Sequence, residues 1–398
     1  MPQAQSHQRN LVIAALAAAI WGAVALTPWA KDALAAGQTR TVIASPKKEQ
    51  IPVDEPQVAQ SQRALGPGFK RIQTEHFVIL SDGPGAWTRD KAQLLEITAE
   101  RLAKVMNEMG LKFQPPRHKL MCVLIEDHDR FEAFAAAQDG VLARWIGGYY
   151  AVKTNRIVFF NPRTAPDFAR ADQDLEAARQ QLRRAEDNAD RARRKGEEQA
   201  ENAYRFFAQS VRNQIERHES SIGDQAARSG ASKTIHEAVH LLAFNCGLQM
   251  RSRAYPFWLS EGLATCFEPA SEHDAKRGRF GPAHDVPVRD NELAHAIAQN
   301  SLIPLARFIT LPEAPTGDAH AAGIMYAQAH SLFRFLYQRS PRAVGELFLD
   351  WSNLPPGDPK PARITELFEH RFGKINEVER AWRAWAATPA RLVQATTD

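Results

Sequence analysis

Residues 234–242 read TIHEAVHLL, a pattern with two histidines four positions apart. On an α-helix, positions i and i+4 differ by about 40° in direction and about 6 Å along the axis. His236 and His240 can therefore direct two imidazoles at one ion, while Glu237 lies about 100° further round. This offset suits a general base, because a carboxylate that bound the metal could not also accept a proton from the attacking water. Ser232 can cap the start of the helix.

A second stretch makes a metal site the stronger interpretation. HExxH alone also occurs in core helices whose two histidines are satisfied by other protein groups. Residues 257–264 read FWLSEGLA, and a short loop followed by a helix starting near Ser260 would bring Glu261 back to the imidazoles. His236, His240 and Glu261 are then three ligands for one zinc ion per chain, and tetrahedral zinc keeps a fourth position for water.

The two motifs carry a resemblance to a known group of enzymes. HEAVH at 236–240 followed by WLSEGLA at 258–264 resembles the gluzincin (peptidase-MA-like) zinc metallopeptidases, and most closely an uncharacterised bacterial domain family of that group. The resemblance implies an α+β fold: a zincin-like domain over residues 70–390, with a small mixed sheet, an active-site helix and a helical C-terminal part. It also implies three zinc ligands and one general base, namely His236, His240, Glu261 and Glu237.

The strands before the zinc helix bear on the type of peptidase. Apolar runs predict strands at 75–81 and 120–125 and a hairpin within 148–160. In gluzincins, the penultimate strand before the zinc helix is a sheet edge that pairs with extended substrate, and by resemblance this strand is 147–152. Aminopeptidases carry a Glu there that holds the free amine of the substrate. The sequence GYYAV at 148–152 has no carboxylate, which favours an endopeptidase.

Tyr326 is the candidate for stabilising the oxyanion. In the aminopeptidase branch, a Tyr that opens a later helix donates a hydrogen bond to this oxygen, and Tyr326 is similar in spacing and context. The alternative is a core tyrosine whose hydroxyl is satisfied inside the protein. His330 is the second candidate donor.

An insertion is predicted between the hairpin and the zinc helix. Over residues 166–228, apolar side chains recur at spacings of three and four among many charged ones, which is a heptad pattern. Gly196 can break the run, so we expect a coiled-coil helical hairpin inserted into the zincin-like domain. Such a hairpin is either a packing arm with solvated faces or an arm that docks a protein partner.

The first 36 residues predict a targeting segment. An apolar run follows Arg9, and Ala-Leu-Ala at 33–35 provides a small-x-small cleavage site. Residues 1–36 are therefore a signal peptide, or an N-terminal anchor that tethers the chain to the membrane through residues 11–30. The protein is exported in both cases: periplasmic or secreted after cleavage, and anchored in the inner membrane without it. Residues 37–69, polar and with four prolines, predict a flexible linker.

Composition narrows the classes of partner. The 398 residues are 44% hydrophobic and 24% charged, as in ordinary globular proteins. The net charge of +4 is small, and basic residues alternate with acidic ones, so we expect no nucleic-acid partner. Cys122 lies within a predicted core strand. Cys246 and Cys266 lie on helices that would share the metal, so they form either a disulfide or two buried free thiols.

Two functional hypotheses follow. The first is an exported zinc metallopeptidase that cleaves a peptide or protein substrate, with Glu237 as the general base. The alternative is a non-catalytic zincin-fold binding or assembly module with a structural zinc, in which the helical hairpin is the interaction arm. Glu237 favours the enzyme, because a structural zinc site does not need it.

Overall fold

The structure is a computed structural model and describes residues 50–142, 146–315, 318–355 and 359–388. The predicted targeting segment 1–36 lies outside these residues. Among the helices within the described ranges, none is both long and apolar enough to cross a membrane.

A five-stranded mixed sheet forms the first half of the fold, with the order β1-β2-β3-β5-β4. The parallel strands β2, β3 and β5 are buried on both faces, which explains their continuous apolar runs. β1 and β4 are the two edges and pair antiparallel with β2 and β5. The strands are β1 (Lys70–Gln73), β2 (Phe77–Ser81), β3 (Leu120–Ile125), β4 (Gly148–Ala151) and β5 (Arg156–Phe160).

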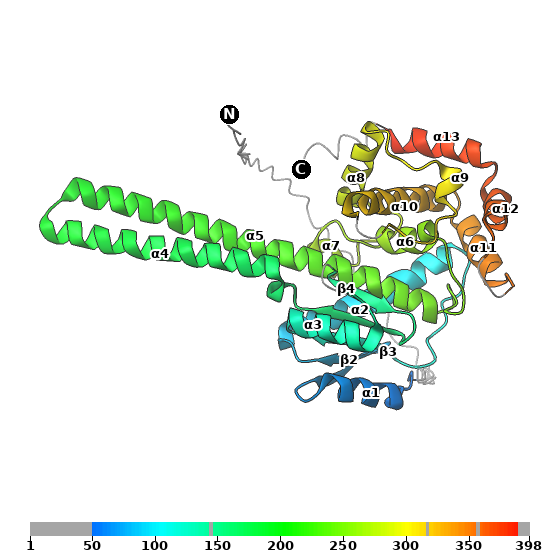
Figure 1. Ribbon diagram of the computed structural model, residues 1–398, viewed down its shortest axis with the longest axis horizontal. Coiled ribbons are helices and arrows are strands. Elements are labelled where there is room, and N and C mark those ends of the chain that lie inside the picture. The colour runs from blue at the N-terminus through cyan, green and yellow to red at the C-terminus, as the bar shows by residue number, and fades with distance from the viewer. Residues whose placement is uncertain (1–49, 143–145, 316–317, 356–358, 389–398) are drawn as a thin grey trace, which may run out of the picture. The chain divides into compact units, whose positions relative to one another are not determined.

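Helices cover both faces of this sheet (Figure 1). One face packs on α2 (Gly85–Glu108) and on the last turns of α5 (Glu198–Asn245), through the main hydrophobic core. The opposite face packs on α1 (Glu55–Leu65) and α3 (His128–Phe134), which a single turn of π-helix extends over Ala135–Asp139. Alternate side chains of β2, β3 and β5 point to the two cores, as the two-residue period of a strand requires.

The C-terminal half is helical, and α10 is its central element (Figure 1). It packs against both α6 and α8, and its middle is almost fully buried. The expected α+β fold with a small mixed sheet is thus confirmed. The helices are α6 (Phe257–Cys266), α7 (Glu272–Lys276), α8 (Pro287–Ala298), α9 (Leu305–Phe308), α10 (Ala319–Arg339), α11 (Pro341–Ser352), α12 (Pro361–Phe372) and α13 (Ile375–Ala386).

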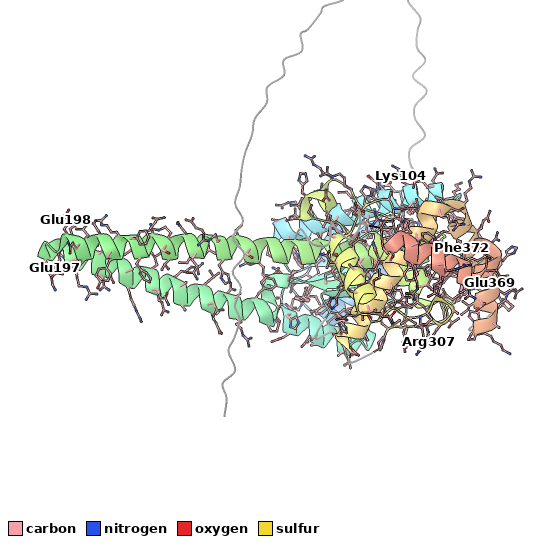
Figure 2. All side chains as sticks on the ribbon, turned by 90° about the horizontal axis from the view of Figure 1, so that it is seen from above. Lys104, Glu197, Glu198, Arg307, Glu369 and Phe372 are labelled. Carbon is pink, nitrogen blue, oxygen red and sulfur yellow. The ribbon has the colours of Figure 1, made fainter. Side chains whose placement is uncertain are left out.

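A long helical hairpin separates β5 from the helix that carries HEAVH. After a 3-10 turn at Pro162–Thr164, α4 (Pro166–Lys195) runs to Gly196, which ends it in the left-handed conformation with φ 73°. The chain then turns at Glu197 and returns along α4 as α5 (Figure 2). A small apolar cluster joins the two helices: Leu175, Val211 and Ile215, with Phe168, Ala171, Ala178 and Leu182 packed against them. These two helices are the ones expected at 166–228.

Two boundaries differ from the sequence-based expectation. α5 runs without a break from Glu198 to Asn245, so Ser232 lies inside a helix and caps nothing. The preceding turns of α5 already accept the backbone hydrogen bonds that an N-cap side chain would otherwise accept. The linker expected at 37–69 is wrong over residues 54–65, because Asp54 caps α1 by accepting a hydrogen bond from the Gln57 amide at 3.1 Å. Its first part, 37–49, lies outside the described residues.

α1 belongs to the folded body because one of its faces is apolar or small. Val58, Ser61 and Leu65 are buried against the sheet, at the spacing of one helix face. Pro56 lies in the first turn, where proline costs no hydrogen bond. A proline count alone therefore gave too long a linker.

All three cysteines are buried and free. Cys122 lies on β3 inside the main core, as expected. Cys246 and Cys266 do not form a disulfide.

Candidate metal centre

α5 and α6 bring the three predicted ligands together. The Nε2 atom of His236 lies 3.1 Å from Glu261 Oε2, and the Nε2 atom of His240 lies 3.3 Å from Glu261 Oε1. The two imidazole Nε2 atoms are 3.3 Å apart. Ligands that bind one tetrahedral zinc ion at about 2.0–2.1 Å are about 3.3 Å from each other. The donor types and their separations therefore fit a zinc ion.

Tight packing of α6 fixes the position of Glu261. Trp258 and Leu259 on this helix are buried in the main core. Gly262 faces α10 so closely that a Cβ atom there would lie 2.7 Å from the carbonyl oxygen of Ala329. Only glycine permits this approach, because that distance is shorter than any normal contact. The glycine next to the ligand thus serves helix packing.

A buried carboxylate supports the first histidine. Glu268 Oε1 lies 3.1 Å from the Nδ1 atom of His236. Arg289 donates two hydrogen bonds to the same carboxylate, at 2.9 Å from Nε and 3.0 Å from Nη2. Burial would raise the pKa of Glu268, but His236 and Arg289 outweigh it and lower that pKa to about 2. An ionised Glu268 holds the proton on Nδ1 and leaves Nε2 free to bind a metal.

Glu237 is held away from the three ligands. Its Oε1 atom lies 3.0 Å from Lys233 Nζ, and its Oε2 atom accepts a hydrogen bond of 2.9 Å from the backbone amide of Tyr150 on β4. Burial would raise the pKa of Glu237, but the positive charge of Lys233 outweighs it and lowers the pKa. The carboxylate is therefore ionised and positioned, as a general base must be.

These groups line one cleft of about 560 Å³. The lining comes from β4, α5, α6, the loop 312–314 and Tyr326. β4 is an edge strand, as the sequence predicted for 147–152. Its outer backbone groups face the cleft, since the Tyr150 amide reaches Glu237 and not β5.

Tyr326 lies in this cleft and His330 does not. The centroid of the Tyr326 ring is 6.4 Å from that of His236, and the Arg289 guanidinium lies 5.5 Å from the centroid of the tyrosine ring. Burial and the nearby Glu261 raise the pKa of the Tyr326 hydroxyl, which therefore keeps its proton and can donate it in a hydrogen bond. His330 is only 1% exposed, and burial lowers its pKa to about 3.

Three residues of this site were not predicted. Lys233 stands four positions before Glu237, so helical spacing could have indicated it. Glu268 and Arg289 come after α6 in the chain, on a different element from His236. Helical spacing therefore could not relate them to this histidine. Only the tertiary fold brings them to the histidine.

The described residues contain a second possible metal-binding group. His128, Asp129 and Glu132 on α3 each offer a ligand atom, and these atoms lie within 4.8 Å of one another. The Asp129 side chain is 94% exposed, so water competes strongly with it for any ion. The HEAVH group is the better enclosed of the two.

Comparison with known proteins finds one similarity. A family described as "Protein of unknown function (DUF1570)" matches residues 230–356. No curated protein and no solved structure matches the chain significantly. The matched segment begins at the last turns of α5 and ends after α11, so it contains the three candidate ligands together with Glu237, Glu268, Arg289 and Tyr326. Over the region that contains the candidate metal ligands, the chain is therefore similar to an uncharacterised family.

Proposed function

We propose that this protein is an exported zinc-dependent metallopeptidase of the gluzincin type, with a zincin-like fold, and that it acts as an endopeptidase. One observation carries the proposal. His236, His240 and Glu261 place their donor atoms at the separations of a tetrahedral zinc site, and Glu237 lies beside them without taking part. This is the arrangement that hydrolysis by an activated water requires.

Each group at the site has a separate role in the proposed reaction. When bound, zinc supplies Lewis-acid chemistry to the water and to the scissile carbonyl. Glu237 accepts a proton from the water as its oxygen bonds to the carbonyl carbon. The same carboxylate then delivers the proton to the amine nitrogen as the C–N bond breaks. The Tyr326 hydroxyl donates a hydrogen bond to the oxyanion.

The free edge of β4 orients the substrate. An edge strand offers unpaired backbone donors and acceptors, and an extended peptide can add to it as a further strand. β4 borders the cleft and lies next to the base, since the Tyr150 amide already hydrogen-bonds to Glu237. β4 carries no carboxylate that could hold a free amine, which supports cleavage within a chain.

The second candidate is a non-catalytic binding module with a structural zinc. The hairpin arm supports it, because α5 exposes three aromatic side chains there. Phe206 is 80% exposed, Phe207 is 50% exposed and Tyr204 is 39% exposed. Exposed aromatic side chains grouped on one element are typical of surfaces that dock a partner.

The two candidates differ in their dependence on Glu237. Wild type, Glu237→Gln and the surface control Glu366→Gln are loaded with zinc and assayed on one peptide library. We expect all three to bind zinc, and we expect cleavage by Glu237→Gln to fall by about 10²–10⁴, because an amide cannot accept the proton. Equal cleavage by all three refutes the mechanism. If none of the three proteins cleaves any peptide, and a protein partner binds wild type and Glu237→Gln equally well, the protein is a non-catalytic binding module.

A further inference from the structure

A second cavity adjoins the metal cleft at the end of the sheet. Its volume is about 580 Å³. It lies where the 152–155 turn after β4, the start of β3, the helix α1 and the chain after α5 meet, and mostly polar side chains line it. The mechanism proposed above uses none of them.

The two cavities share a hydrogen-bonded wall. Tyr150 lines the metal cleft, and its hydroxyl donates to Asn155 Oδ1 at 3.1 Å. Asn155 and Asn245 line the second cavity and exchange amide hydrogen bonds of 3.0 and 2.8 Å. Asn245 is also the last residue of α5, the helix of the zinc ligands. One side of this wall faces the metal, and the other faces the second cavity.

The second cavity carries an excess of positive charge. Arg117, Lys153 and Arg251 line it, and all three are exposed. Within the described part of the chain, no carboxylate lies at ion-pair distance from any of them. Arg156 also lines the cavity, but Asp139 neutralises it at 2.8 Å. These three cations thus have no ion-pair partner among the described residues, and they outnumber the one carboxylate of the lining, Asp54.

Asp54 and Lys119, two further charged residues of the lining, already make hydrogen bonds within the protein. The Asp54 carboxylate accepts the hydrogen bond that caps α1. Lys119 donates to the main-chain carbonyls of Thr74 and Glu75. Arg251 lines the second cavity together with Asn155 and Asn245 of the shared wall. The unpaired charge therefore extends up to the metal cleft.

We propose that this cavity is a subsite for acidic side chains of the polypeptide that the metal centre cleaves. The inference rests on the proposed function and adds a substrate class to it. Tyr150 lies next to the base, and Lys153 follows three positions later, in the 152–155 turn that begins directly after β4. A substrate strand paired with β4 would place a side chain about three positions from the scissile bond among Arg117, Lys153 and Arg251.

The test compares peptides that differ only in charge. Three peptides share the same residues around the scissile bond. The first carries Glu two to four positions before this bond, and the second carries Glu two to four positions after it. The third has Gln at all of these positions. The readout is the ratio of kcat/KM for a Glu peptide to that for the Gln peptide. Two or three partly exposed ion pairs imply that wild type prefers one Glu peptide by about 5- to 30-fold at low salt. The preference should shrink in 0.5 M NaCl (about 4 Å screening length).

Two matched triple variants locate the preference. Arg117→Gln/Lys153→Gln/Arg251→Gln should lower the ratio to about 1, because the cavity then lacks its unpaired charge. The control removes the same charge elsewhere, through substitution of Lys104 on α2 (Figure 2) and of Arg184 and Arg194 on the arm, all to Gln, and it should keep the wild-type ratio. Zinc content and circular dichroism check folding. If the cavity triple variant misfolds, Lys153→Gln on the exposed turn replaces it.

Binding to the zinc-loaded Glu237→Gln protein separates this inference from the proposed function. If wild type cleaves nothing, yet the labelled Glu peptide binds this protein in a salt-sensitive way that the cavity substitutions abolish, the subsite is supported and the peptidase proposal fails. Equal handling of Glu and Gln peptides by wild type would overturn the subsite. So would a preference that survives in the cavity variant, or tighter binding of a single-stranded ten-nucleotide oligothymidylate than of the Glu peptide.

Discussion

Replacing Glu268 by glutamine should weaken zinc binding without removing a ligand. The carboxylate of Glu268 accepts a hydrogen bond from Nδ1 of His236 and two hydrogen bonds from Arg289. Its side chain is only 7% exposed, so water cannot take over these interactions. Glutamine keeps the shape but carries no charge, and its amide nitrogen cannot accept a hydrogen bond. The imidazole would then lose the partner that fixes its orientation and raises its basicity.

The size of the effect follows from the number of interactions lost. Loss of a partner outside the ligand set typically costs 10- to 100-fold in metal affinity, which is about 1.4–2.7 kcal/mol. We expect the upper half of that range, because all three interactions with Glu268 are charge-assisted. The metal-free protein should lose about 1–3 kcal/mol of unfolding free energy, since the one ion pair left to Arg289 among the described residues is that with Glu292, at 2.9 Å.

Glu292→Gln is the matched control. It removes a carboxylate from the same arginine, but Glu292 is 38% exposed and pairs with Arg289, whereas Glu268 contacts His236 directly. Zinc affinity is measured by competition with a chelator, and unfolding free energy by urea titration of the metal-free proteins. Zinc affinity of Glu268→Gln within about threefold of wild type would refute the role assigned to this carboxylate.

Three further outcomes are expected. Tyr326→Phe should lower kcat by about 10²–10³ and leave the zinc content unchanged, and an unchanged kcat would exclude this hydroxyl from the reaction. Gly262→Ala should destabilise the protein by about 1–3 kcal/mol, seen as a lower urea midpoint, because the methyl group meets the Ala329 carbonyl. Burial lowers the pKa of Lys91 to about 8. The unfolded chain holds this proton up to about pH 10.4, so it binds more protons than the folded protein between about pH 8 and 10.4. The unfolding free energy of wild type should therefore rise relative to that of Lys91→Met, by up to about 3 kcal/mol over this range. Equal pH dependence of the two proteins would contradict this.

The sequence sufficed for the parts of the site that one helix or one motif encodes. His236, Glu237 and His240 keep their relative directions in any regular α-helix, so their spacing predicted their geometry. Glu261 was predicted from the second motif and a helix starting near Ser260, and it lies beside both histidines as expected. The apolar runs likewise predicted the buried strands, since a parallel strand covered on both faces needs no polar side.

The parts that depend on contacts between distant segments could not be predicted. Glu268 reaches His236 because the chain turns after Cys266, and no sequence pattern predicts that turn. Ser232 has the chemistry of a helix cap, but the arm had already started the helix. Local signals indicate what a residue can do, whereas the start of a helix depends on the residues that precede it.

The unbroken course of α5 gives the arm and the metal ligands a common helical phase. Each residue turns the helix by about 100°, so one residue added between the arm and His236 would rotate the exposed Tyr204, Phe206 and Phe207 by about 100° around the axis of α5. Seven residues would restore that direction to within about 20° and displace the arm by about 10 Å. A seven-residue change in length at this point therefore preserves the direction of these side chains relative to His236, whereas a one-residue change does not.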